Sequence, residues 1–168
     1  MEKIPPRTYE VQTGFNLGML RSEDWVDWAG EAITADFDSP SLRILAGLQS
    51  PYDDIEINRL WNKSFVELKI IPLPEEQIVP FFVSTILQQT LTRKQSQKQT
   101  LTTLMSLCLS KKYDRQLMDF YLLYHAMSDL EHDTTQWYWD GANRNNISKI
   151  VDDYFHSWLK NHGQDLPI

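Results

Sequence analysis

Apolar residues recur at steps of three and four along most of the chain, which is the spacing of amphipathic α-helices. The pattern is clearest near the C-terminus, where we expect Asn146 to cap a helix that Gly163 ends. One helical face of that segment carries the apolar positions Ile147, Ile150, Val151, Tyr154, Phe155, Trp158 and Leu159. The same spacing predicts further helices that begin at or beside Ser22, Pro40, Asp53, Glu75, Ser96 and Asp114.

Several of these starts carry local signals. The hydroxyl of Ser22 is expected to cap the first helix, and Ser39 precedes a proline at the first helical position of the next. The Asp53-x-x-Glu56 spacing is typical of a capping box. Within the apolar segment from Glu75 to Leu91, Pro80 is expected either to kink the helix or to mark a restart.

Only the stretch from Tyr9 to Phe15 suggests a strand, and we interpret it as an extended arm. The chain therefore predicts an all-α, single-domain bundle of about six to seven antiparallel helices. Residues 1–21 form the short extended N-terminal arm in this interpretation, and residues 22–163 form the helical core of a domain that covers residues 1–168.

Length and composition agree with an ordinary globular domain. A chain of 168 residues can bury roughly 70% of its unfolded surface, so it needs no metal or disulfide to fold. The single cysteine, Cys108, excludes an internal disulfide and lies in an apolar run, where we expect a buried thiol. The N-terminus does not resemble a signal peptide, and the segment from Ile78 to Leu91 is too short and polar to span a bilayer. We expect a soluble cytoplasmic protein.

The net charge of −7 is unevenly distributed. Between Ser22 and Asn58, Arg43 is the only basic residue among nine acidic ones, whereas basic residues predominate from Arg93 to Arg115. This second block has neither a helix-turn-helix signature nor aromatic residues to stack bases, and the protein is acidic overall. Nucleic-acid binding is therefore not the favoured interpretation.

The best candidates for metal chemistry are histidines. His125, Asp129 and His132 stand at i, i+4 and i+7 of one predicted helix, and His156 could complete a site from the last helix. The dipeptide His132-Asp133 resembles that of metal-dependent HD phosphohydrolases, but no histidine precedes His125 to supply their first ligand. A metal-binding bundle or metal-dependent hydrolase is the alternative function.

No other residue set indicates an enzyme. The chain has no Gly-x-Ser-x-Gly elbow, and the segment from Gly14 to Gly18 lacks the lysine and hydroxyl residue of a phosphate loop. We therefore expect no cofactor.

Surface recognition is the leading hypothesis. An acidic helical protein is suited to mask a basic partner, as small immunity proteins mask nuclease toxins. The rhythm of Trp25, Trp28 and Ala29 is similar to that of small helical bacterial proteins. A loop from Thr134 to Asn145 adds aromatic residues that are expected to anchor a partner, bind a ligand or pack over the helices. The candidate partner-binding residues are Asp24, Asp27, Glu31, Asp53, Asp54, Trp137 and Trp139.

Overall fold

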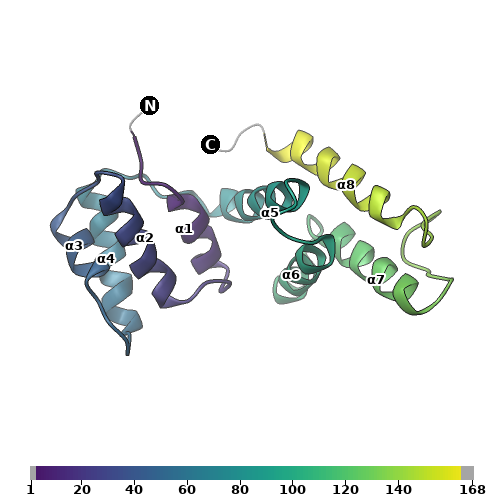
Figure 1. The fold of residues 1–168 in the computed structure, drawn as a ribbon, viewed down its shortest axis with the longest axis horizontal. Helices are drawn as coiled ribbons and strands as arrows, with labels where there is room; N and C mark the ends of the chain where they lie inside the picture. The colour runs from purple at the N-terminus through teal and green to yellow at the C-terminus, as the bar shows by residue number, and fades with distance from the viewer. Residues whose placement is uncertain (1–2, 164–168) are drawn as a thin grey trace. The chain divides into compact units, whose positions relative to one another are not determined.

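The computed structural model describes residues 3–163, in which all regular secondary structure is α-helical (Figure 1). This confirms the all-α prediction, with eight helices in the described part rather than six to seven. The helices are α1 (Thr8–Asn16), α2 (Ser22–Thr34), α3 (Pro40–Ala46), α4 (Asp54–Glu67), α5 (Glu75–Leu91), α6 (Gln97–Ser110), α7 (Met118–His132) and α8 (Ile147–His162).

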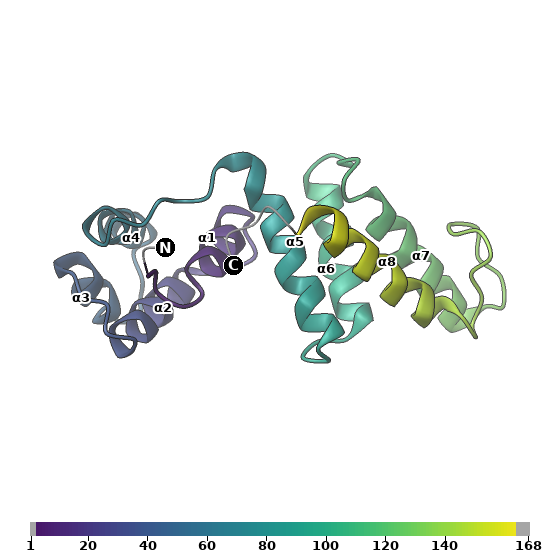
Figure 2. The same cartoon turned by 90° about the horizontal axis from the view of Figure 1, so that it is seen from above.

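The chain divides into two compact units, residues 1–82 and 83–168, and the division falls within α5. The helices of each unit can be followed in Figure 2. We describe the units separately, and the single-domain organisation expected from the sequence stays a prediction. No helix among residues 3–163 has the length and apolarity needed to cross a membrane.

An aromatic cluster forms the core of the first unit, where α2, α3 and α4 pack on one another. The rings of Trp25 and Trp61 stack with centroids 4.5 Å apart, and Trp28 meets Trp25 edge-on at 5.4 Å. Phe65 packs edge-on against Trp61 at 4.9 Å. These rings come from the faces that helical spacing predicts, since Trp25, Trp28 and Trp61 are all buried.

The second unit has its own core, built where α7 packs against both α6 and α8. Phe120 lies at its centre and contacts Phe155 and Trp158, each with a ring-centroid distance of 6.1 Å. Cys108 is fully buried, as the apolar run around it predicts. Burial, together with the nearby Asp114 carboxylate, raises the pKa of its thiol above the ordinary value.

The predicted extended arm is wrong where the structure forms α1, and residues 1–2 of that arm lie outside the described residues. The buried side chain of Gln12 explains the difference. Its amide nitrogen donates to the Leu73 carbonyl at 3.3 Å, and its amide oxygen accepts from the Leu73 N–H at 3.0 Å. These bonds and the burial of Val11 favour a helix despite the β-propensity of the local sequence.

Most predicted helix starts are confirmed. Ser39 accepts a hydrogen bond from the Leu42 N–H, Asp53 from the Ile55 N–H, and Ser96 from the Gln99 N–H. The expected Ser22 cap is wrong, because α2 begins after Arg21 and the Asp24 carboxylate accepts the Arg21 N–H at 2.7 Å.

Two further expectations about helix ends have different outcomes. Asn146 stands at the cap position of α8, but its side chain bonds the preceding loop instead of the helix. The segment from Glu75 to Leu91 forms one helix that continues through Pro80, so no restart occurs there.

Candidate functional site

The connection between α7 and α8 carries the most exposed large apolar side chain of the described residues. We call residues 134–145 the Trp137 loop. Trp137 is 88% exposed, and the structure gives its ring no aromatic contact and no hydrogen-bond partner. The six tryptophans of the chain otherwise include four that are buried, Trp25, Trp28, Trp61 and Trp158, and the half-buried Trp139.

The side chain of Gln136 organises this loop. Its amide nitrogen donates to the carbonyls of Trp139, at 2.6 Å, and Ala142, at 3.1 Å. Its amide oxygen accepts the N–H groups of Tyr138 and Trp139, both at 2.8 Å. One glutamine thereby uses both of its donors and both acceptor sites on backbone groups that follow the exposed tryptophan in the chain.

Both ends of the loop are also fixed. Arg144 donates from Nε to the carbonyls of Leu130, at 2.8 Å, and Asp133, at 2.9 Å, which satisfies an orphan carbonyl at the end of α7. Asn146 donates to the carbonyl of Gly141, whose φ of 76° is a conformation that glycine adopts without strain.

Two aromatic contacts attach the loop to its helices. The Tyr138 ring stacks on His125 with centroids 5.0 Å apart, and Trp139 meets Tyr154 edge-on at 5.7 Å. Tyr154 in turn donates to the Asp119 carboxylate at 3.0 Å. Burial and that carboxylate raise the pKa of Tyr154 far above its ordinary value, so its phenol stays a neutral donor. Of the two tryptophans predicted to bind a partner, Trp139 therefore packs against α8 and Trp137 faces solvent.

A second candidate surface lies on α2 in the first unit. Asp24, Asp27 and Glu31, three of the predicted partner-binding residues, line one depression of about 400 Å³. We call it the acidic hollow; its remaining lining residues are Arg7, Val26, Gly30 and Ala46. The spacing i, i+3 and i+7 explains why one helix brings the three carboxylates together.

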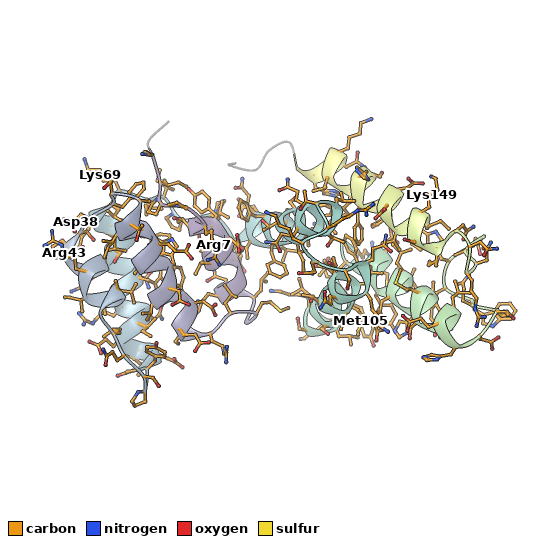
Figure 3. All side chains as sticks on the ribbon, in the orientation of Figure 1. Arg7, Asp38, Arg43, Lys69, Met105 and Lys149 are labelled. Atoms are coloured by element: carbon orange, nitrogen blue, oxygen red, sulfur yellow. The ribbon has the colours of Figure 1, made fainter. Side chains whose placement is uncertain are left out.

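The carboxylates of the hollow differ in how they are held. Glu31 accepts a hydrogen bond from Arg7 at 2.7 Å, and Asp24 accepts the Arg21 N–H. Arg7, labelled in Figure 3, is the only cation among the lining residues. Asp27 is exposed, and the structure gives its carboxylate no hydrogen bond or ion pair. The hollow therefore keeps an unpaired negative charge that faces solvent.

The remaining acidic candidates, Asp53 and Asp54, lie at the start of α4. Asp53 caps that helix, and Asp54 accepts a hydrogen bond from the Ser22 hydroxyl of α2. Neither lines the acidic hollow. Their hydrogen bonds give both residues a role in the structure of the first unit.

The structure does not bring the predicted metal ligands together. His125 is half-buried and surrounded by the rings of Tyr121, Tyr124 and Tyr138, at centroid distances of 4.5, 5.1 and 5.0 Å. Asp129 and His132 follow on the same helix, whereas His156 contacts the backbone carbonyl of Asp152 on α8. Within residues 3–163, no group of three or more histidine, cysteine, aspartate and glutamate side chains is placed to hold a metal ion.

Sequence reasoning located the aromatic loop but missed the residues that shape it. Gln136 and Arg144 bond only backbone groups in and around the loop, so no side-chain spacing indicates their role. Comparison of the chain with protein-family models, with curated proteins and with solved structures found no match.

Proposed function

We propose that this protein is a non-enzymatic protein-interaction domain with two separate recognition features: Trp137 in the second unit binds a partner, and the acidic hollow in the first unit attracts a basic one. The observation that carries the proposal is the 88% exposure of Trp137 on a loop whose backbone is fixed by hydrogen bonds. Large aromatic residues of this kind are the commonest anchors of protein interfaces.

The order of the loop supports a binding role because it lowers the cost of association. A flexible loop loses conformational freedom when a partner holds it, whereas a loop already fixed by Gln136, Arg144 and Asn146 loses little. If Trp137 served only to pack against its own protein, we would expect its ring to be buried, but it is 88% exposed. The arrangement therefore favours insertion of Trp137 into an apolar pocket of another protein.

Charge supports the choice of a basic partner. Asp27 forms no ion pair in the structure, and exposed Asp133 and Asp140 lie close in sequence to Trp137. Opposite charges accelerate the encounter of two proteins and disfavour wrong partners. Neutralisation of a basic toxin by an immunity protein is one role of this kind.

Affinity capture with matched variants tests the proposal. Wild-type protein and Trp137→Ala are immobilised, captured proteins are identified by mass spectrometry, and each candidate partner is then purified and its binding measured directly. Ile55→Ala is the control, because Ile55 is also a large exposed apolar residue, at 82%, but belongs to α4 of the first unit and not to the Trp137 loop. We expect a basic protein that the wild type and Ile55→Ala bind and that Trp137→Ala loses. Equal binding by all three would contradict the role of Trp137.

The acidic hollow is tested with the same purified partner. A Cβ at Gly30 would meet no atom within 4 Å, and Gly30 lines the hollow, so Gly30→Gln adds bulk there without changing its charge. Asp27→Asn removes the unpaired charge. We expect both changes to weaken binding and Asp27→Asn to reduce its salt dependence. If both variants bind the partner as tightly as the wild type does, the hollow plays no part in partner binding.

A further inference from the structure

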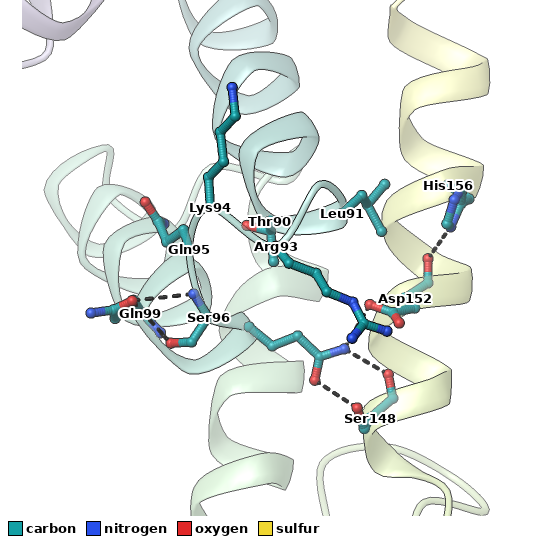
Figure 4. Close-up of a pocket in the computed structure, with 11 residues that line it drawn as sticks. Thr90, Leu91, Arg93, Lys94, Gln95, Ser96, Gln99, Ser148, Asp152 and His156 are labelled. Atoms are coloured by element: carbon teal, nitrogen blue, oxygen red, sulfur yellow. Dashed lines mark hydrogen bonds between the residues drawn. The ribbon is translucent and has the colours of Figure 1, made fainter.

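A second pocket lies in the second unit, between the α5–α6 connection and α8, and no part of the proposed interaction surface uses it. Its volume is about 580 Å³, within the range of small-molecule sites. Figure 4 shows side chains from both segments around it, among them Arg93, Asp152 and His156, and Gln97 also lines the pocket.

The side chain of Gln97 joins the two walls of this pocket. Its amide nitrogen donates to the Ser148 carbonyl and to Oδ1 of Asp152, both at 2.7 Å, and its amide oxygen accepts the Ser148 hydroxyl at 3.0 Å. The first turn of α6 is thereby tied to α8. Asp152 keeps its second carboxylate oxygen free to accept a hydrogen bond from a ligand.

Backbone hydrogen bonds hold the cationic side of the pocket. The N–H of Lys94 donates to the Gln89 carbonyl and that of Arg93 to the Thr90 carbonyl, both at 2.9 Å, which is a Schellman ending of α5. Beneath it, Gln95 donates to the buried hydroxyl of Thr100 at 2.7 Å. The Arg93 side chain therefore extends from a fixed backbone.

Arg93 is a cation that lacks an ion pair among the described residues, in contrast to Arg7, Arg21, Arg43, Arg59, Lys98 and Lys149. Figure 4 shows its guanidinium directed toward Asp152 and Ser148, whereas Lys94 extends in another direction. His156 adds a further polar group. Its Nδ1 lies 2.8 Å from the Asp152 carbonyl, which can only accept, so Nδ1 carries a proton and Nε2 is left for a ligand.

We propose that this pocket binds a small hydroxylated organic phosphate, with the phosphate on Arg93 and a ligand hydroxyl on Asp152. The planar guanidinium presents paired donors that match the oxygens of a phosphate or a carboxylate. The free carboxylate oxygen of Asp152 is negatively charged, so it repels a second anionic group. It can accept a hydrogen bond from a ligand hydroxyl. A ligand that carries both an oxyanion and hydroxyl groups satisfies the two residues together, and this inference stands independently of the proposed function.

NMR titration of the full chain tests the proposal with four probes at constant ionic strength: ribose 5-phosphate, inorganic phosphate, ribose and acetate. We expect saturable shifts of amides in the α5–α6 connection and the first half of α8, with ribose 5-phosphate bound most tightly. Arg93→Gln should weaken its binding roughly tenfold or more, as expected when a charged hydrogen-bond donor is lost. Tighter binding of acetate than of inorganic phosphate would show that the site prefers carboxylates and would overturn the proposal of a phosphate ligand.

Lys112→Gln is the matched control. Lys112 follows α6 with a φ of 55°, as Arg93 follows α5 with a φ of 60°, and both are exposed cations at equivalent helix ends. We expect Lys112→Gln to leave the affinity within about twofold of wild type. Lys112 does not line the pocket, and salt screens the attraction between an exposed charge and a ligand that it does not contact. Equal weakening by both variants would show attraction by overall charge and overturn the site.

Asp152→Asn tests the hydroxyl contact. The asparagine oxygen can still accept from Gln97, so the two walls stay joined while the carboxylate charge is removed. We expect this variant to reduce the preference for ribose 5-phosphate over inorganic phosphate. An unchanged preference, or shifts that do not saturate in the wild type, would overturn the proposal.

Discussion

The ring of Tyr138 stacks on His125 with centroids 5.0 Å apart and an interplanar angle of 29°. This contact gives the histidine a packing role where its sequence position suggests a metal ligand, and it attaches the Trp137 loop to α7. The side chain of Gln136 also holds the loop backbone by hydrogen bonds. Trp137 is therefore exposed because the residues beside it are fixed in place.

Removal of the Gln136 amide should loosen the loop selectively. In Gln136→Ala, the N–H groups of Tyr138 and Trp139 lose their acceptor, so we expect their amide hydrogens to exchange faster. Amides in the middle of α7 should keep their protection, because they bond within the helix. Gln116→Ala is the control, since Gln116 is exposed and its side chain has no hydrogen bond in the structure. Exchange at Tyr138 and Trp139 that matches the wild type would contradict the role of Gln136.

Fluorescence quenching tests the exposure of Trp137 in the free protein. Four of the six tryptophans are buried and Trp139 is half-buried, so Trp137 should supply most of the emission that acrylamide reaches. We expect Trp137→Phe to remove most of the quenchable emission. Trp139→Phe should remove a smaller part. If Trp137→Phe leaves the quenchable fraction of the emission unchanged, Trp137 is not exposed in solution. That result would contradict its role as an anchor for a partner.

Two glycines in helices should respond to alanine in opposite directions. A methyl group at Gly30 meets open space, and alanine is favoured over glycine within a helix by about 1 kcal/mol, so Gly30→Ala should raise the free energy of unfolding. A methyl group at Gly14 would lie 2.7 Å from Leu20 carbon atoms, so Gly14→Ala should lower it. Urea unfolding measures both values. A loss of stability in Gly30→Ala would contradict the open hollow on α2.

The Glu67 carboxylate should make the first unit sensitive to acid. The Ser41 N–H donates to it at 2.9 Å and the Ser41 hydroxyl at 2.8 Å, and these bonds hold the pKa of Glu67 below its ordinary value. A lowered folded pKa means that the stabilisation is present above the unfolded pKa, near 4.5, and is lost as pH falls through the folded pKa.

We therefore expect Glu67→Gln to lower the free energy of unfolding at pH 7 by less than about 1 kcal/mol, because the carboxylate is exposed to solvent. The difference from wild type should shrink as the pH is lowered below 4.5. A difference that stays constant between pH 7 and pH 3 would show that the charge of Glu67 plays no part.

Local signals explain how much of the fold the sequence predicts. Ser39, Asp53 and Ser96 cap helices whose first turns follow directly, so a few adjacent residues contain the whole signal. The arm interpretation of Tyr9 to Phe15 failed because Gln12 finds its partner at Leu73, 61 residues away. Ser22 was misassigned as a cap because its hydroxyl bonds Asp54, which only the packing of α2 and α4 brings near.

The candidate site divides in the same way. The acidic hollow could be anticipated in part, because Asp24, Asp27 and Glu31 share a face of one helix. The spacing of His125, Asp129 and His132 is equally regular, but it contains no information about the Tyr138 ring that covers His125. Which of the aromatic residues faces solvent depends on hydrogen bonds from the Gln136 side chain to backbone groups of the loop. These bonds depend on the conformation of the loop, which the spacing of side chains does not reveal.

Isothermal titration of the purified partner with the wild type, Trp137→Ala and Ile55→Ala measures how much Trp137 contributes to partner binding. A tryptophan anchor at the centre of an interface contributes about 2 kcal/mol or more, so Trp137→Ala should raise the Kd roughly 30-fold or more. Ile55→Ala should leave the Kd within about twofold, as surface residues outside an interface do. A Kd for Trp137→Ala equal to that of wild type would show that Trp137 does not anchor the partner.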